Sequence, residues 1–357
     1  MALDKNKRKK VAVLITSKGK PGGLERRFIA LFLELSKRPD AEFMLICHES
    51  LLREFKGLNN KVRVYDEGSL LPTARKITSI LKENHISHVH VAANPTLLSL
   101  LLGVNALLKG IVMTISSVDS SKISPDDFSF YSKLAHRGTY FFAKKIDFLS
   151  PSIQEVHSNL FGVNPKKIEV APCSFLALRK AGSHQKRRRY DLCFVSRLVP
   201  LKGVELLVAA LQRIDRSLVV RICGDGKLKQ EFIRNEKIIA HHQVILGYST
   251  NPTEELAQSK VFLSLQKHNN YPSQSLLEAI TCGCAVIATD VGETRMIVTE
   301  NNGRLVNSTT ELVDSIEELL SDECLRERLV AESRSVIDSA HTLENFVSYF
   351  TSRVIGL

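Results

Sequence analysis

The sequence has no tryptophan, and aromatic residues make up only 6% of its 357 residues. Modules that bind single-stranded nucleic acid stack bases on aromatic side chains, so this shortage argues against such a partner. The chain also lacks zinc-finger spacing of Cys and His and has no basic helix that continues into heptads. We therefore expect no nucleic acid among its partners.

Long apolar runs and secretion signals are missing as well. No continuous apolar run reaches the roughly 18 residues expected of a membrane span, and the first residues, MALDKNKRKK, lack the apolar core of a secretory signal. The seven cysteines are odd in number, and Cys47, Cys193 and Cys223 lie in apolar runs. Such cysteines are typical of buried thiols in a reducing compartment. These features predict a cytoplasmic protein.

Acidic residues are outnumbered by basic ones. The chain has 49 Lys and Arg against 38 Asp and Glu, a formal charge of +11, and part of the excess lies in residues 5–10 and 186–189. This balance favours phosphorylated ligands or an anionic membrane face at the inner side of the cell membrane. Two solvated basic segments without any partner are the alternative.

Short β-branched runs alternate with amphipathic stretches from end to end, a pattern typical of parallel sheets covered by helices. In the first half we predict strands at residues 11–16, 42–47, 62–65, 88–92, 111–115, 146–149 and 168–171. In the second half we predict strands at residues 192–196, 218–223, 244–246, 261–265, 285–288 and 303–306.

Between the halves, residues 178–190 read LRKAGSHQKRRRY, a polar and basic stretch without apolar period that indicates a linker. The sequence thus predicts an α/β protein of two Rossmann-like, doubly wound domains, residues 1–178 and 190–340, that face each other across a cleft. A terminal helix within residues 341–357 is expected to pack back on the first domain. Open α/β sheets bind ligands at the carboxyl ends of their strands, so the site is expected there.

Two turns carry residues suited to phosphate. The first strand ends in TSKGKPGGLERRF, where Gly22 and Gly23 would let backbone N–H groups approach an anion at a helix start. A plain tight turn is the alternative. The second domain opens with VSRLVPLKGVELL, where Arg197 ends a strand and Lys202 precedes a helix. A guanidinium binds phosphate in bidentate fashion and an ammonium supplies a mobile charge. The alternative is that both side chains are solvated and bind no phosphate.

A third segment, YPSQSLLEAITCGC, predicts a helix that begins near Ser273. Its first N–H groups and its dipole would form an anion site. Glu278 lies four residues after Gln274 and three after Ser275, hence on the same face. A carboxylate behind a phosphate site would repel the phosphate, so it fits the hydroxyl groups of a ribose diol better.

The segments GGLERR, VSRLVPLKG, GDG, LGY and YPSQSLLEAITCGCAVIATDVG, in this order, closely resemble retaining glycosyltransferases of family four, which have the GT-B fold. The resemblance covers both domains, and the last string is its most specific part. It implies an enzyme of hexosyltransferase type that moves a sugar from a nucleotide-diphosphate sugar to a glycan or lipid-linked acceptor. Such enzymes often serve surface polysaccharide or lipopolysaccharide synthesis.

The resemblance also implies roles for individual residues. Arg197 and Lys202 would bind the diphosphate, and Glu278 the ribose. Gly22 and Gly23 would lie over the diphosphate from the opposite domain. The remaining donor-binding positions would be Gly224 in a turn, Gly247 near the base, and the backbone amides of Gln274, Ser275 and Leu276 at the outer phosphate. No metal or other cofactor is expected, because the cations and the helix dipole stabilise the leaving diphosphate.

The sequence departs from the family in two places. Family members carry two acids eight residues apart, and the position of the first, which contacts the donor sugar, falls here on Asn270 or Asn269. A family His is replaced by Ser116 or Ser117. This puts the donor sugar and full activity in doubt.

Three residues are candidates for the acceptor side, with a structural role as the alternative for the last two: Ser116, His90 and Asp119. The departures leave open a partner protein that binds nucleotide sugars without catalysis, and a basic surface-binding module is a third hypothesis. An epimerase on the same fold lacks support, because the family-four string is present.

Overall fold

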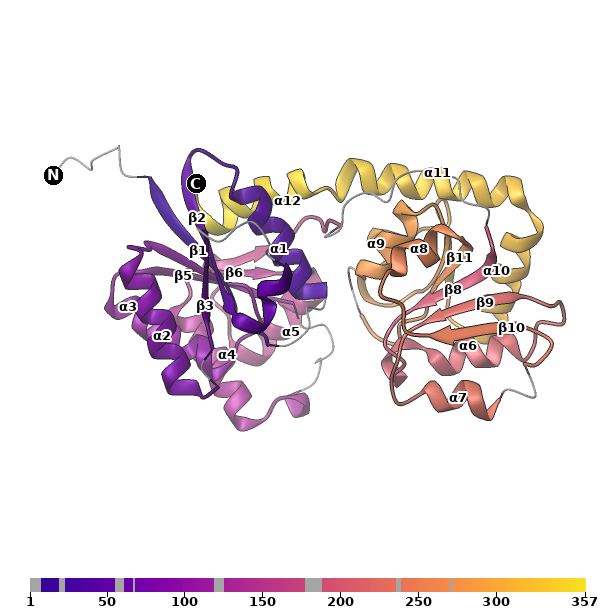
Figure 1. The fold of residues 1–357 in the computed structure, drawn as a ribbon, viewed down its shortest axis with the longest axis horizontal. Coiled ribbons are helices and arrows are strands. Elements are labelled where there is room, and N and C mark those ends of the chain that lie inside the picture. The colour runs from indigo at the N-terminus through magenta and orange to yellow at the C-terminus, as the bar shows by residue number, and fades with distance from the viewer. Residues whose placement is uncertain are drawn as a thin grey trace. The chain divides into compact units, whose positions relative to one another are not determined.

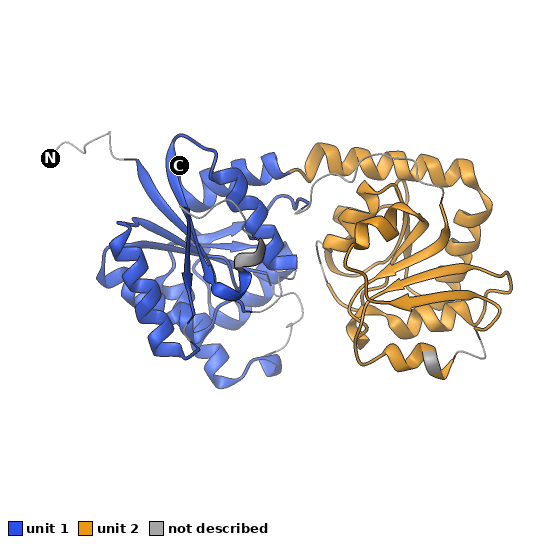
Figure 2. Ribbon diagram, in the orientation of Figure 1, with its two compact units in different colours: residues 1–178, 343–357 blue, residues 179–342 orange. Residues whose placement is uncertain are grey.

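The computed structural model describes residues 8–18, 23–54, 61–66, 68–118, 125–176, 188–235, 239–269, 271 and 273–357. The chain forms two compact units (Figure 2). Unit 1 comprises residues 1–178 together with 343–357, and unit 2 comprises residues 179–342. Each unit contains one parallel sheet with helices packed against it (Figure 1), which confirms the predicted α/β fold class.

The sheet of unit 1 has the strand order β3-β2-β1-β4-β5-β6-β7, and every described pairing is parallel. Its strands are β1 (Lys9–Ile15), β2 (Ala41–His48), β3 (Val62–Tyr65), β4 (His88–Val91), β5 (Val112–Ser117), β6 (Lys145–Phe148) and β7 (Ile168–Val170). The helices between them are α1 (Gly23–Leu35), α2 (Leu70–Glu83), α3 (Leu97–Leu108), α4 (Phe130–Phe142) and α5 (Pro151–Phe161). The predicted strands of the first half are all present, with ends shifted by a few residues.

Strand β1 shows why this sheet is covered on both faces. Its residues from Val11 to Ile15 are fully buried. Val11 and Val13 pack into one hydrophobic cluster, whereas Ala12 and Leu14 pack into another. Successive side chains of a strand point to opposite faces, so a continuous apolar run requires helices on both sides.

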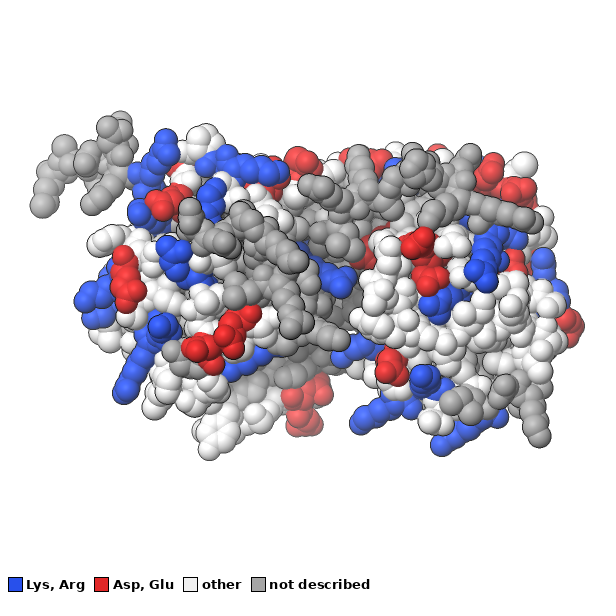
Figure 3. Space-filling view, in the orientation of Figure 1, with Lys and Arg blue, Asp and Glu red and all other residues white. Residues whose placement is uncertain are grey.

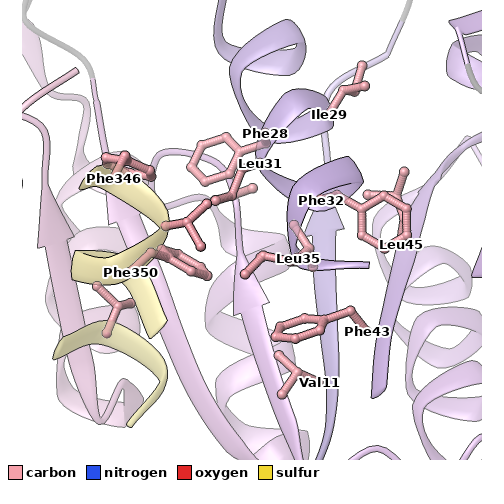
Figure 4. Close-up of a cluster of buried hydrophobic side chains, with 14 of the residues drawn as sticks. Val11, Phe28, Ile29, Leu31, Phe32, Leu35, Phe43, Leu45, Phe346 and Phe350 are labelled. Atoms are coloured by element: carbon pink, nitrogen blue, oxygen red, sulfur yellow. The ribbon is translucent and has the colours of Figure 1, made fainter. Parts of the chain in front are cut away.

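The end of the chain completes one of these two clusters. Helix α12 (Leu343–Tyr349) continues into a wider turn, Phe350–Ile355, and both segments belong to unit 1. Phe346 and Phe350 are fully buried in the cluster that also contains Phe28 of α1 (Figure 4). The Arg27 guanidinium lies 4.3 Å from the ring centroid of Phe346, so a cation–π contact adds to the apolar packing.

A buried chain of hydrogen bonds also holds the terminal segment. Asp147 of β6 accepts from the Tyr349 hydroxyl at 2.7 Å and from the Ser116 hydroxyl at 2.7 Å. Ser116 Oγ lies 3.0 Å from His90 Nε2, and Thr114 Oγ1 lies 3.0 Å from His90 Nδ1. We call these five residues the His90–Asp147 chain.

Burial, with the nearby His88 second, lowers the pKa of His90 to about 3, so its imidazole is neutral. A neutral ring donates from one nitrogen and accepts at the other, and therefore fits between two hydroxyls. Burial raises the pKa of the Asp147 carboxyl, while the hydrogen bonds from Ser116 and Tyr349 oppose this rise. The carboxylate thus depends on these two donors.

The sheet of unit 2 has the strand order β10-β9-β8-β11-β12-β13, again with parallel pairings throughout the described strands. Its strands are β8 (Tyr190–Val195), β9 (Val219–Cys223), β10 (Gln243–Gly247), β11 (Ser259–Ser264), β12 (Ala285–Thr289) and β13 (Arg304–Val306). Its helices are α6 (Val204–Leu211), α7 (Lys229–Arg234), α8 (Pro252–Ala257), α9 (Gln274–Thr281), α10 (Thr309–Ser321) and α11 (Glu323–Ala340). The order reverses between β8 and β11, and such a switch point is where doubly wound sheets bind ligands.

The predicted linker is shorter than expected at its carboxyl end. The Arg188 guanidinium donates to the carbonyls of Gly283 at 2.8 Å and Ser259 at 2.9 Å. Strand β8 then begins at Tyr190. A buried guanidinium satisfies carbonyl groups from several loops at once, so a residue that looks like part of a basic tail anchors unit 2. All seven cysteines have free thiols.

Removing the Tyr349 hydroxyl tests the link between the terminal segment and the sheet. Tyr349→Phe keeps the ring but deprives the buried Asp147 carboxylate of a donor, which costs about 1–3 kcal/mol. We expect a lower free energy of unfolding by that amount in urea denaturation. Tyr131→Phe is the matched control, because Tyr131 is 66% exposed, and should change stability by less than about 0.5 kcal/mol. Equal effects of both changes would contradict this account.

Candidate functional site

The carboxyl edge of the unit 2 sheet is built from loops that lie in direct backbone contact. The Leu198 N–H, in the loop after β8, donates to the carbonyl of Asp225, in the loop after β9, at 2.9 Å. The Lys267 N–H, after β11, donates to the carbonyl of Leu201 at 3.0 Å. Three loops around the switch point thus form one connected edge.

Glycines make this close approach possible. A Cβ atom on Gly224 would lie 1.9 Å from the carbonyl oxygen of Ser196. Gly203 has a φ of +71°, and a Cβ there would lie 1.9 Å from the carbonyl oxygen of Leu265. Any side chain at either position would push the loops apart. For Gly224, which the sequence suggested as a donor-binding residue, the structure thus supplies a packing reason of its own.

Lys202 spans the switch point. It ends a short 3-10 turn, Pro200–Lys202, between β8 and α6, and its Nζ donates to Gln266 Oε1, after β11, at 2.8 Å. Burial, followed by the positive charge of Arg197, lowers the pKa of Lys202 to about 8. Arg197 itself is exposed. Two cations that disfavour each other in this way would be stabilised by an anion bound to both.

Helix α9 follows the Gln266 loop, and its first turn contains three of the residues expected to contact phosphate. Gln274 and Ser275 are half-buried, and Ser273 precedes them as the N-cap residue. The Leu276 N–H donates to the Ser273 carbonyl at 3.1 Å. This bond competes with the expected contact between the Leu276 amide and a phosphate, which stays a prediction.

Glu278 is half-buried on α9, on the side of Gln274 and Ser275. The apolar residues Leu277 and Ile280 of the same helix are buried in the core. Burial, with the Glu278 carboxylate second, raises the pKa of the Cys282 thiol to about 11. The Glu278 carboxyl therefore lies close to the Cys282 thiol at the end of its own helix.

The sequence interpretation missed one carboxylate near this helix. The Asn269 amide nitrogen donates to Glu293 Oε2, and its amide oxygen accepts from the Tyr271 N–H at 3.0 Å. Glu293 lies in the 3-10 segment Gly292–Met296 after β12. Gly292 has a φ of +52°, and a Cβ there would come within 2.4 Å of the Asn269 side chain. The only signal in the sequence was the glutamate that follows TDVG.

Four donor-side expectations remain, two in unit 2 and two in unit 1. Gly247 ends β10, and its carbonyl accepts from the Gly224 N–H at 3.2 Å, so it joins the connected edge. Asn270 lies outside the described residues, as does Gly22 of the glycine turn in unit 1. Gly23 is the exposed first residue of α1.

The acceptor-side expectations in unit 1 need correction. His90 and Ser116 are both fully buried within the His90–Asp147 chain, so neither side chain presents a surface to an acceptor. Their chemistry serves the attachment of the terminal segment. Ser117, the alternative to Ser116, is also buried and accepts from the Tyr140 hydroxyl at 3.2 Å. Asp119 lies outside the described residues.

The described parts of the chain contain no group of three or more His, Cys, Asp or Glu side chains arranged to hold a metal ion. Within the same residues, no helix combines the length and apolar content that crossing a membrane requires.

Comparisons with known proteins agree with this geometry. The family described as "Glycosyl transferases group 1" matches residues 179–336, which lie in unit 2. The chain is 27% identical over 176 residues to a Campylobacter jejuni protein named "N-acetylgalactosamine-N,N'-diacetylbacillosaminyl-diphospho-undecaprenol 4-alpha-N-acetylgalactosaminyltransferase". That alignment covers 46% of this chain and 48% of the relative, so the chain spans about half of its length.

Solved structures resemble the chain over nearly its whole length. Anabaena Alr3699/HepE, in complex with UDP and glucose, has a TM-score of 0.79 at 17% identity and covers 97% of this chain and 100% of its own. The lipopolysaccharide outer core galactosyltransferase WaaB has a TM-score of 0.71 at 18% identity, with coverage of 97% and 100%. At such identities the likeness shows the GT-B fold. Residues 179–336 are thus similar to the glycosyl transferases of group 1, and both units share the fold of the solved structures.

Proposed function

We propose that the protein is a retaining glycosyltransferase that moves a sugar from a nucleotide-diphosphate sugar to a glycan or lipid-linked acceptor. The observation that carries this proposal is the position of Lys202 at the switch point. Its ammonium donates a hydrogen bond to Gln266, and the positive charge of Arg197 contributes to lowering its pKa. Helix α9 begins at Gln274, soon after Gln266 along the chain. Glu278 lies on the same face of this helix as Gln274 and Ser275. Cations and a helix start would hold a diphosphate, and the carboxylate would hold a ribose.

In the proposed reaction, the bond between the anomeric carbon and the phosphate oxygen breaks, and its electron pair leaves with the nucleoside diphosphate. An acceptor hydroxyl forms the new bond to that carbon on the same face, and its proton passes to the departing diphosphate oxygen. Arg197 and Lys202 stabilise the charge that develops on the diphosphate, in place of a metal ion. Glu278 accepts hydrogen bonds from the ribose hydroxyls and thereby orients the donor.

The names of similar proteins suggest the pathway and the acceptor. One relative is named for a diphospho-undecaprenol acceptor, WaaB for the lipopolysaccharide outer core, and HepE was solved with UDP-glucose. We propose, by this similarity, a role in surface polysaccharide or lipopolysaccharide synthesis in the cytoplasm, at the membrane face where a lipid-linked acceptor would lie.

A partner protein that binds a nucleotide sugar without transferring it is the second candidate. It is motivated by the amide at Asn270 and by the buried serines that replace a family histidine. The Glu293 carboxylate beside Asn269 weighs against it, because an acid is still present next to the altered segment. Donor binding without transfer to any membrane extract would favour this candidate.

Removing the cations should remove nucleotide binding. The reference ligand is whichever of UDP, GDP and ADP the wild-type protein binds most tightly with EDTA present. Arg197→Ala or Lys202→Ala should lower the affinity for this nucleotide by about 10- to 100-fold, because charged hydrogen bonds to the diphosphate are lost. Isothermal titration calorimetry measures the affinity. Arg216→Ala is the matched control, since Arg216 is an exposed guanidinium that precedes β9 at the opposite edge of the sheet. If the wild-type protein binds none of the three nucleotides, the proposal fails.

The role of Glu278 can be separated from phosphate binding. Glu278→Gln should lower the affinity for the nucleoside diphosphate by about tenfold, because the contact with the ribose is lost. Inorganic pyrophosphate has no ribose, so its affinity should stay the same or rise slightly as a negative charge disappears. Competition titrations with both ligands measure this difference. An equal loss for both ligands would place Glu278 in a structural role.

The pKa of Lys202 predicts how affinity depends on pH. Below pH 8 the free protein carries a charged Lys202, and above pH 8 this charge is lost. A bound diphosphate favours the charged form and raises this pKa, so affinity should fall as pH rises, by up to about tenfold per unit above 8. Titrations between pH 6.5 and 9.5 measure the slope.

Lys202→Arg is the control for that slope, because a guanidinium stays charged throughout this range. The affinity of the Lys202→Arg variant for the nucleoside diphosphate should change much less with pH. Ionisation of the ligand's nucleobase affects binding to both proteins alike. Identical slopes for the two proteins would show that another group titrates.

A further inference from the structure

Helix α4 of unit 1 exposes an apolar stripe along one face. Phe130 is 76% exposed, Leu134 48% and Phe141 73%. These positions, with Arg137 between them, follow the helical spacing, so they lie on one side. The opposite side, including Ala135 and Thr139, is buried. The apolar residues on the outer side therefore make no contribution to the core.

The end of α3 extends this stripe. A Cβ on Gly138 would lie 2.4 Å from Leu100, and one on Gly103 would lie 2.8 Å from Phe142 Cβ, so the two helices are closely packed. Leu107 and Leu108 follow one turn later and are 66% and 74% exposed. We call the exposed apolar set the α4 surface: Leu107, Leu108, Phe130, Tyr131, Leu134 and Phe141.

Positive charge surrounds one end of the α4 surface. The Lys167 ammonium lies 5.8 Å from the ring centroid of Phe141 and donates to its carbonyl at 2.6 Å. The basic residues of this region are Lys109, Lys133, Arg137, Lys144, Lys166 and Lys167. Strands β5, β6 and β7 are neighbours in a parallel sheet. Lys109, Lys144, Lys166 and Lys167 directly precede these strands, so they gather at the amino edge of the sheet.

Acidic groups near the α4 surface are fewer and lie elsewhere. Asp126 and Asp127 precede α4 at its other end, Glu155 is exposed on α5, and Glu169 is buried against Lys145. Over the face that Figure 3 shows, Lys and Arg are mixed with Asp and Glu in both units. A local combination of apolar side chains and lysines is thus a more specific feature than the net charge.

We propose that the α4 surface docks on an anionic membrane face. Leucine and aromatic side chains would enter the boundary between headgroups and acyl chains, while the surrounding lysines contact acidic headgroups. Exposed apolar side chains with basic residues at one end of the set fit such a surface. This inference does not rest on the proposed transfer reaction, although it would bring a lipid-linked acceptor close to the enzyme.

Vesicle flotation tests the proposal with the full chain. Vesicles of 30% phosphatidylglycerol in phosphatidylcholine should bind the wild-type protein, and pure phosphatidylcholine should bind it at least tenfold more weakly. The double variant Leu108→Gln with Phe141→Gln should reduce binding to the anionic vesicles by at least tenfold. Lys144→Gln with Lys166→Gln should reduce it by about tenfold, with a weaker dependence on salt.

Matched controls change the same residue types on α2 of the same unit. Leu71→Gln alters a leucine that is 57% exposed, and Arg75→Gln with Lys76→Gln removes two exposed charges. Both should leave vesicle binding within about twofold. Nucleotide-dependent thermal stabilisation, which should persist in every variant, verifies folding separately from docking.

Three results would overturn the proposal. The first is a wild-type protein that does not float with anionic vesicles. The second is an equal loss of binding in the α2 controls. The third is a dimer in light scattering that the Leu108→Gln, Phe141→Gln variant separates, because a second copy would then cover the α4 surface.

Discussion

The carboxyl edge of the unit 2 sheet depends on how closely the loops after β8 and β11 approach each other. Lys202 donates to Gln266 across the point where the strand order reverses. Gly203 lies against the carbonyl of Leu265 directly beside this bond. Because a parallel sheet brings all carboxyl strand ends to one edge, residues far apart in sequence meet there without any further device. The lowered pKa of Lys202 follows from that crowding, since burial and a second cation both disfavour its charge.

The first unit uses polar residues in the opposite way. His90, Ser116 and Asp147 have the chemistry of a catalytic constellation, yet they are buried and connected to Tyr349 of the terminal segment. A neutral imidazole and two hydroxyls can satisfy one another's hydrogen bonds in a core. The Asp147 carboxylate then accepts from the hydroxyls of Ser116 and Tyr349. Reactive residue types on a strand are therefore weak evidence for a site unless their exposure is known.

Much of the architecture could be predicted because its signals are local. Continuous apolar runs such as that of β1, separated by amphipathic stretches, indicate buried parallel strands. Arg197 and Lys202 stood out because they lie between a strand and the next helix, where a parallel sheet presents its ligands. Glu278 stood out because it shares a helix face with Gln274 and Ser275. The pairing of Asn269 with Glu293 could not be predicted, because it joins loops from different strands across a glycine with a positive φ. The role of Arg188 was equally hidden in what looked like a basic tail.

The sequence by itself determined the two parallel sheets, the position of the charged residues at strand ends and the apolar faces of the helices, because periodicity and the alternation of strands and helices along the chain are properties of local segments. Only the tertiary structure decided which polar residues are buried and which apolar ones stay exposed. His90 is covered by Phe350 from the far end of the chain, whereas Phe141 remains 73% exposed although it lies in an apolar helix. Burial is set by what packs on a residue from distant segments, and this information is absent from any local stretch of sequence.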